Sequence, residues 1–255
     1  IVKKAEDFIE FSKFSLKIFE DVVLANDTYV DIILNGPYSL KLHSMGLVDD
    51  NNKVNFYDGK IRVVDTKGDE MHKYAPADYR DYVAEHVEPW SYLKFPYLKK
   101  IGWKGFIDGQ DSSVYHATPL SRLNAADGMA TPLAQKEYDR MYAVLGGKPV
   151  HNTLAMHWAR LVELLYSAEH CLELAQDPDI TGNELRAPID KIVGEGVDTV
   201  EAQRGTLTHH YWTDDKGVVT NVNIIVGTTN NNAAINMSIK KAAQGLIKKG
   251  TEVSD

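Results

Sequence analysis

The stretches VEAQRGTLTHHY, residues 200–211, and NIIVGTTN, residues 223–230, decide how the last third of this sequence is expected to fold. Runs of β-branched and aromatic residues in and around them are typical of strands. These runs are residues 197–200, 205–212 and 218–226. The residues DDKG at 214–217 separate the last two runs and suit a hairpin turn. We therefore predict small antiparallel β hairpins here.

Elsewhere, apolar residues at a spacing near 3.6, Pro at first turns and Gly or Pro at ends indicate helices. The predicted helices are residues 3–25, 76–88, 131–145, 150–175 and 233–248. A further β hairpin is predicted over residues 53–64, with Asp58-Gly59 at its tip. Residues 90–109 are expected to be irregular. The fold class is therefore α+β, mainly helical with small antiparallel β hairpins, in a single domain over residues 1–255.

Composition limits the possible partners. With 44% apolar residues in 255, the chain can bury a sizeable core. Its net charge of -8 argues against nucleic acid and acidic membranes, which need clustered Lys and Arg. No apolar run approaches the ~18 to 20 residues that span a bilayer. A single cysteine fits a reducing compartment, so a cytoplasmic location is expected.

The histidines carry no clear metal-site pattern. His209 and His210 are adjacent in a predicted strand, so they should point to opposite faces. His151 and His157 are six residues apart on a predicted helix and would not share a face. His116 is expected to be a surface histidine. None of these positions predicts a metal ligand.

Other polar residues have simple structural interpretations. Glu163 lies three residues after Arg160, which suggests an ion pair within one helix. Cys171 is expected to be a small buried apolar residue. No phosphate-binding loop, nucleophile elbow or zinc-ligand spacing is present in the sequence.

Arg204 is the charged residue with the most chemical potential. It lies between Gln203 and Gly205 at a predicted strand turn. A guanidinium offers five donors in a fixed fork, which suits anions or polarised ligands. The same group could instead brace a tight glycine turn through backbone carbonyls. The residues by themselves leave both interpretations open.

Residues 200–211 and 223–230 resemble the signature along the metal pocket of nickel-iron hydrogenase large subunits. The similarity continues, in order, through residues 35–49, 56–65, 78–85, 90–97, 118–124 and 157–163. These segments look like the cytoplasmic, multimeric branch, which includes coenzyme-F420-non-reducing enzymes linked to heterodisulfide reductase and NAD-coupled enzymes. Of the two, the first is favoured.

The resemblance implies a nickel ion held by four cysteine thiolates, two of which bridge to an iron that carries carbon monoxide and cyanide. Arg204 matches the family arginine that lies over the open site and helps to polarise hydrogen. Thr228 matches the position whose hydroxyl donates a hydrogen bond to a cyanide, with help from the neighbouring backbone at Gly227 and Gln203. These groups would tune the centre without binding metal.

Two departures from the family pattern stand out. Gln203 replaces the usual proline. The two cysteine pairs that bind the metals, one near each end of the family's subunits, are missing, and Cys171 matches neither. We therefore expect the chain, which begins at Ile1 without methionine, to be an interior portion of a longer subunit. On this view it holds no metal, is inactive by itself and tends to associate.

The resemblance implies reversible oxidation of hydrogen by the parent protein. Electrons would pass to an iron-sulfur small subunit, then to an acceptor subunit linked to heterodisulfide reductase or NAD. The alternative is a metal-free paralogue that acts as a scaffold, like the quinone-site subunit of respiratory complex I, which shares the fold and a similar Glu-Ala-x-Arg-Gly stretch.

Overall fold

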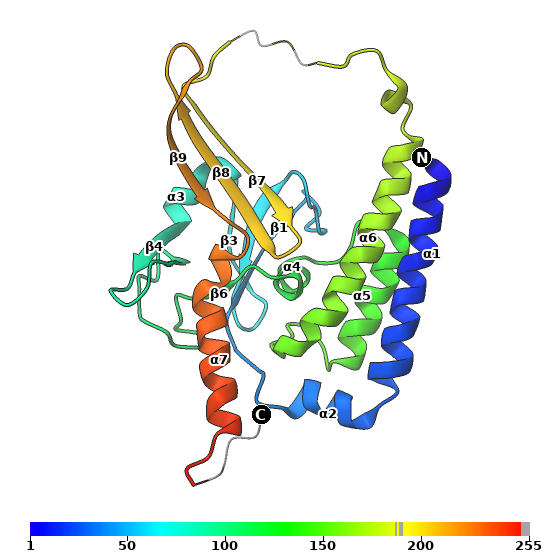
Figure 1. The fold of residues 1–255 in the computed structure, drawn as a ribbon, viewed down its shortest axis with the longest axis vertical. Coiled ribbons are helices and arrows are strands. Elements are labelled where there is room, and N and C mark those ends of the chain that lie inside the picture. Colours follow the sequence, from blue (N-terminus) through cyan, green and yellow to red (C-terminus); the bar gives the residue numbers. More distant parts are fainter. Residues whose placement is uncertain (187, 189–190, 251–255) are drawn as a thin grey trace.

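The computed structural model describes residues 1–186, 188 and 191–250 of the chain. It confirms the α+β class: a bundle of helices forms one side of the molecule in Figure 1, and the small sheets, with the last helix beside them, form the other. Helices α1 (Val2–Phe19), α5 (Pro132–Val144) and α6 (Met156–Gln176) run side by side. Helix α4 (Pro119–Ala125) lies between this bundle and the sheets.

The helices of the bundle bury many of the apolar residues whose spacing predicted them. Trp158 of α6 is buried and lies 5.6 Å, centroid to centroid, from Phe19 of α1. The predicted helix 3–25 extends past α1 as a π-helical turn, Glu20–Leu24. Helix α6 begins at Met156 rather than at residue 150, after a 3-10 turn at Thr153–Ala155.

Helix α5 lies within one residue of the predicted bounds at each end, but its N-terminus is capped from another helix. Thr131 makes no capping hydrogen bond with its side chain. The Glu169 carboxylate of α6 accepts hydrogen bonds of 2.9 Å from the backbone N–H groups of Leu133 and Ala134. It also accepts one of 2.6 Å from the Thr131 hydroxyl. A negative charge at a helix N-terminus is stabilising, so this contact fixes α5 to α6.

The prediction of a hairpin over residues 53–64 was wrong. Strand β2 (Lys60–Val64) pairs with β1 (His43–Val48) and β3 (Glu70–Tyr74), both antiparallel. Strand β6 (Tyr115–His116) joins β1 in parallel. The Asn55 side chain accepts hydrogen bonds from the N–H groups at positions 57 and 58, so local turn bonds replace strand pairing there.

The region 76–109 also differs from the prediction. The helix that begins near Pro76, a 3-10 turn followed by α3 (Tyr79–Tyr82), ends six residues earlier than predicted, because strand β4 (Val83–Val87) follows. Strand β4 pairs with β5 (Lys94–Leu98) inside the stretch expected to be irregular. The β-branched and aromatic side chains here favour strands, and pairing of β4 with β5 prevails over the helix predicted for residues 76–88.

The predicted strands of the last third of the chain are present. Strands β7 (Glu195–Ala202), β8 (Gly205–Thr213) and β9 (Val219–Ile225) make an antiparallel sheet in that order. The Gly217 N–H donates to the Asp214 carbonyl at 3.0 Å, which closes the predicted turn. The chain then passes through a 3-10 turn, Thr229–Asn231, into α7 (Asn232–Leu246), the predicted last helix.

Helix α4 and two further elements had no sequence prediction. Helix α2 (Asp27–Asn35) is capped by the Asn26 side chain, and a short 3-10 turn, Pro178–Thr181, follows α6. In the part of the chain that the structure describes, no helix is both long and apolar enough to cross a membrane.

Candidate functional site

The site is built where the β7–β8 turn meets the loop between β9 and α7. Gly205 has φ +155°, and a Cβ there would lie 2.2 Å from the Ala117 carbonyl oxygen and 2.4 Å from that of Gly227. A Cβ on Gly227 would lie 2.7 Å from the Gly205 carbonyl oxygen. Real Cβ contacts are longer, so glycine at both positions lets the turn and the loop touch. Predicted site residues Gln203, Arg204, Gly227 and Thr228 are thereby brought together.

A buried asparagine ties these segments together. The Asn231 Nδ2 donates to the carbonyl oxygens of Ala117, Arg204 and Gly227 at 3.2, 3.1 and 3.0 Å. Its Oδ1 accepts from the Ala117 N–H at 2.8 Å. An N–H can only donate, so this last bond fixes the orientation of the amide.

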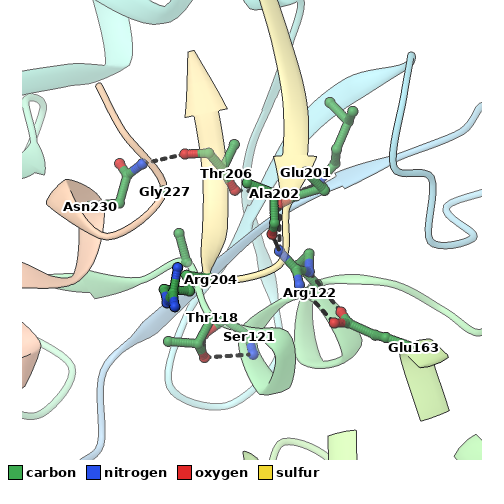
Figure 2. Close-up of polar contacts among 12 residues, drawn as sticks. Thr118, Ser121, Arg122, Glu163, Glu201, Ala202, Arg204, Thr206, Gly227 and Asn230 are labelled. Atoms are coloured by element: carbon green, nitrogen blue, oxygen red, sulfur yellow. Dashed lines mark hydrogen bonds and ion pairs between the residues drawn. The ribbon is translucent and has the colours of Figure 1, made fainter. Parts of the chain in front are cut away.

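The neighbouring Asn230 holds the start of β8. Its Nδ2 donates to the Thr206 carbonyl at 2.6 Å, as Figure 2 shows. Its Oδ1 accepts a hydrogen bond from the buried Tyr115 hydroxyl. The two asparagines therefore anchor the turn from the α7 side of the molecule.

The Arg204 side chain is left free by this arrangement. It is exposed, and Figure 2 shows it directed away from Arg122. Within the described residues, its guanidinium has no hydrogen-bond or ion-pair partner. The Arg204 carbonyl, by contrast, is bound by Asn231. The turn is braced by Asn231, so the arginine does not brace it.

Thr228 is exposed at the start of the 3-10 turn, and its carbonyl accepts from the Asn231 N–H at 2.9 Å. Among the residues that the structure describes, nothing hydrogen-bonds to its hydroxyl. Gly227 is buried in the contact with Gly205, and Gln203 is exposed at the tip of the turn. The backbone of the loop is thus held, while the Thr228 hydroxyl and the Arg204 guanidinium remain available to a ligand.

A buried ionic cluster behind the turn was missed in the sequence. Arg122 of α4 is 1% exposed and forms a fork with both oxygens of Glu163, at 2.6 and 2.7 Å (Figure 2). It also donates to the Glu201 carboxylate at 2.9 Å and to the Ala202 carbonyl at 2.7 Å. The predicted pair between Glu163 and Arg160 was wrong, because Arg122 occupies both oxygens of that carboxylate.

This cluster shifts the proton affinity of its members. Burial lowers the pKa of Arg122, but the charges of Glu163 and Glu201 outweigh it and raise that pKa overall. Burial raises the pKa of Glu201 more than Arg122 lowers it. The Glu201 carboxylate also accepts from the Leu47 N–H at 2.7 Å and from the Thr206 hydroxyl at 3.0 Å. Arg122 is therefore a permanent cation that fixes the end of β7, where the turn begins.

A cavity of about 160 Å³ lies next to the turn, between α4, α6 and α7. Asn231 and Thr118 form part of its wall, and Ile235 and Ile239 of α7 supply apolar surface. His116 also lines it, and burial lowers the pKa of this histidine to about 4. The expectation that His116 is a plain surface residue was wrong, because His116 lies on β6 and its side chain lines this cavity.

Among the other histidines singled out in the sequence, His209 and His210 bond to side chains. His210 is buried and bonds to the Tyr79 hydroxyl at 3.0 Å and to Glu195 at 2.8 Å, whereas His209 bonds to the Tyr211 hydroxyl. The prediction that His151 and His157 lie on one helix was wrong, because His151 precedes α6.

Cys171 is exposed, so its predicted burial was wrong. Across residues 1–186, 188 and 191–250, no cluster of three or more His, Cys, Asp or Glu could hold a metal ion. With Cys171 the single cysteine of the sequence, the described residues do not provide the ligand set of a thiolate-bound nickel-iron centre.

Curated relatives match nearly the whole chain. An iron-sulfur subunit of the F420-non-reducing hydrogenase from Archaeoglobus profundus is 48% identical over 251 residues, covering 98% of this chain and 51% of the relative. The corresponding F420-non-reducing hydrogenase subunit from Methanothermobacter thermautotrophicus is 41% identical, covering 100% and 51%. The NAD-reducing hydrogenase HoxS subunit beta of Cupriavidus necator is 34% identical, covering 98% and 49%. The chain thus spans about half the length of the curated relatives it matches. No protein-family profile matches it.

Solved structures agree with this relationship. A crystal structure of an NAD⁺-reducing [NiFe]-hydrogenase in the H2-reduced state superposes with a TM-score of 0.88 at 32% identity, covering 100% of this chain and 54% of that one. A [NiFeSe]-hydrogenase from Dm. baculatum shares the fold, with a TM-score of 0.58 at 17% identity. In sequence and in fold, the chain is therefore homologous to nickel-iron hydrogenase large subunits, over about half of their length.

Proposed function

We propose that these 255 residues are part of the large subunit of a cytoplasmic nickel-iron hydrogenase that catalyses the reversible oxidation of hydrogen. The observation that carries the proposal is the free guanidinium of Arg204, held beside the Gly227–Thr228 loop by a buried network. Homology over nearly the whole chain to hydrogenase subunits supports it. The cysteine ligands would come from parts of the polypeptide outside these residues.

The chain's own contribution is a polar surface whose backbone is held by Asn231. A nickel-iron centre with carbon monoxide and cyanide ligands, when bound, would supply the redox chemistry of hydrogen. Arg204 would present a permanent positive charge and N–H donors to that centre, and the Thr228 hydroxyl would donate a hydrogen bond to a cyanide. Gly227 and Gln203 would add backbone donors. Because Asn231 holds the backbone that carries these groups, less reorganisation would be needed during reaction.

We also propose partner subunits, and the multi-subunit context of the relatives supports this proposal. We infer an iron-sulfur small subunit that receives the electrons, and a further acceptor subunit linked to heterodisulfide reductase or NAD. The relatives named for F420-non-reducing enzymes have the higher identity, 48% against 34% for the NAD-reducing enzyme, which favours the first acceptor.

Replacing Arg204 tests the proposal. The protein is expressed from its complete reading frame with its maturation machinery, and nickel, iron and hydrogen-dependent viologen reduction are measured on one sample. Arg204→Lys keeps the charge but loses the fork, so we expect turnover to fall by about 100-fold with normal metal content. Arg160→Lys, an exposed arginine on α6, is the matched control and should leave turnover unchanged.

The alternative function is a metal-free scaffold or quinone-site subunit of a redox complex. The absence of a ligand cluster in the described part of the chain is the observation that favours it. Complete protein without nickel and without viologen reduction, despite verified maturation, would establish the alternative and exclude the hydrogenase proposal.

A further inference from the structure

We propose that Asn231 is the positioning residue that sets the distance between Arg204 and Thr228. The inference rests on the proposed function, because it assigns how two site residues are held in register. No sequence motif points to Asn231, and its side chain reaches no ligand. It acts through the backbone of the residues on either side.

Asn231 is the shared anchor of the two segments that carry the site. One amide nitrogen donates both to the Arg204 carbonyl, at 3.1 Å, and to the Gly227 carbonyl, at 3.0 Å. Gly227 directly precedes Thr228, so a single side chain bonds to the backbone of one site residue and to the residue next to the other. Arg122 holds the turn at Ala202 but makes no bond to the Gly227 loop among the described residues.

The amide is specifically suited to this role. Asn231 is 4% exposed, so water cannot replace its bonds. Its donor side meets only carbonyl oxygens, and its acceptor side meets the Ala117 N–H at 2.8 Å. An aspartate of the same size would direct a second oxygen at those carbonyls, which would repel the turn and the loop from each other.

The experiment uses the complete enzyme with Asn231→Asp and Asn231→Ser. A displacement of about 1 Å at a site lowers turnover by up to about 100-fold. We expect Asn231→Asp to lower hydrogen-dependent viologen reduction at least tenfold with normal nickel and iron, and Asn231→Ser, which keeps one donor, to lose less. Amide hydrogen exchange at residues 203–206 and 227–229 should accelerate in the same order.

A double-mutant cycle separates positioning from general stability. If Asn231 acts through Arg204, then adding Asn231→Asp to Arg204→Lys should cause little further loss. Asn232→Asp is the matched control, since Asn232 makes an exposed bond to the Lys94 carbonyl, and it should leave turnover and hydrogen exchange unchanged.

Three results would overturn the assignment. They are unchanged turnover in Asn231→Asp, a full multiplicative loss in the Arg204→Lys background, and failure of both Asn231 variants to fold while Asn232→Asp folds. Unaltered protein without nickel would refute the proposed function instead. In that case faster amide hydrogen exchange in Asn231→Asp would still support the positioning role of Asn231, and unchanged exchange would reject it.

Discussion

Arg122 illustrates, at the scale of one residue, how a buried charge can fix the turn between β7 and β8. Its guanidinium bonds two carboxylates and a carbonyl, and all three come from segments far from it in sequence. Removing one partner of a buried ion pair is costly because it leaves uncompensated charge. Arg122 is therefore a structural counterpart to Arg204, which has the same chemistry but a free guanidinium.

We expect Arg122→Met to lower the free energy of unfolding by about 3 to 5 kcal/mol in urea denaturation. Burial already raises the pKa of Glu201, and loss of Arg122 would raise that pKa further. The folded variant would therefore favour protonated Glu201, which forms more readily at low pH. The destabilisation should therefore be larger at neutral pH than near pH 5. Arg140→Met, which removes half-exposed ion pairs with Glu20 and Glu137, is the control and should cost about 0 to 1 kcal/mol. An equal loss in both variants would contradict the argument.

His116 gives a prediction with the sign set by its lowered pKa. Burial lowers that pKa from 6.5 to about 4, so the unfolded chain binds a proton that the folded chain rejects. Stability from this residue is complete above pH 6.5 and is lost as pH falls toward 4. We expect His116→Gln to flatten the fall in unfolding free energy between these values. The exposed His157→Gln should keep the original slope.

At the scale of elements, the contact between the β7–β8 turn and the β9–α7 loop depends on glycine. An added Cβ at Gly227 would meet backbone atoms of Gly205 at 2.7 to 3.1 Å, and backbone cannot move aside as a flexible side chain could. We expect Gly227→Ala to cost about 1 to 3 kcal/mol, measured by urea denaturation. It should also separate the turn from the loop and so, under the proposed function, lower hydrogen-dependent viologen reduction by the complete protein.

Gly196→Ala is the matched control for this contact. Gly196 lies in β7 of the same sheet, and an added Cβ there meets nothing within 4 Å. It should therefore leave stability nearly unchanged or improve it slightly, because alanine loses less conformational entropy on folding. Comparable losses at both glycines would show that the sheet tolerates no added methyl, rather than that the contact matters.

At the scale of the whole molecule, apolar side chains remain exposed on both sides of the fold. Phe11 and Phe14 of α1 are 55% and 60% exposed, and Ile239 of α7 is 65% exposed. Exposed apolar patches drive association. We therefore expect the 255 residues alone to form oligomers in size-exclusion chromatography, increasingly with concentration.

Charge on α1 should relieve this association. We expect Phe11→Glu combined with Phe14→Glu to shift the population toward monomer, because the patch on that helix would be interrupted. Tyr92→Glu is the control: Tyr92 is an exposed aromatic on a loop, away from α1, and its replacement should change little. A compact monomer of the unaltered chain at all concentrations would refute the prediction.

The sequence by itself determined the elements whose signals are local. The β7–β9 strands, α5 and α7 follow from side-chain pattern, turn residues and helix ends. The resemblance of residues 200–211 pointed to the hydrogenase subunits to which the chain is similar. Local signals failed at residues 53–64 and 83–98, because a strand's partner is a long-range choice that a short pattern does not encode.

Only the tertiary structure decided which polar residues meet. Arg122 pairs with Glu163 and Glu201, at separations of 41 and 79 residues, and Asn231 bonds to Arg204 and Gly227. Arg122, Glu201 and Asn231 look ordinary in the sequence, since charged residues are common on protein surfaces and asparagine is common in turns. Burial makes their bonds obligatory, and burial is a property of the folded chain, because it depends on what other segments cover.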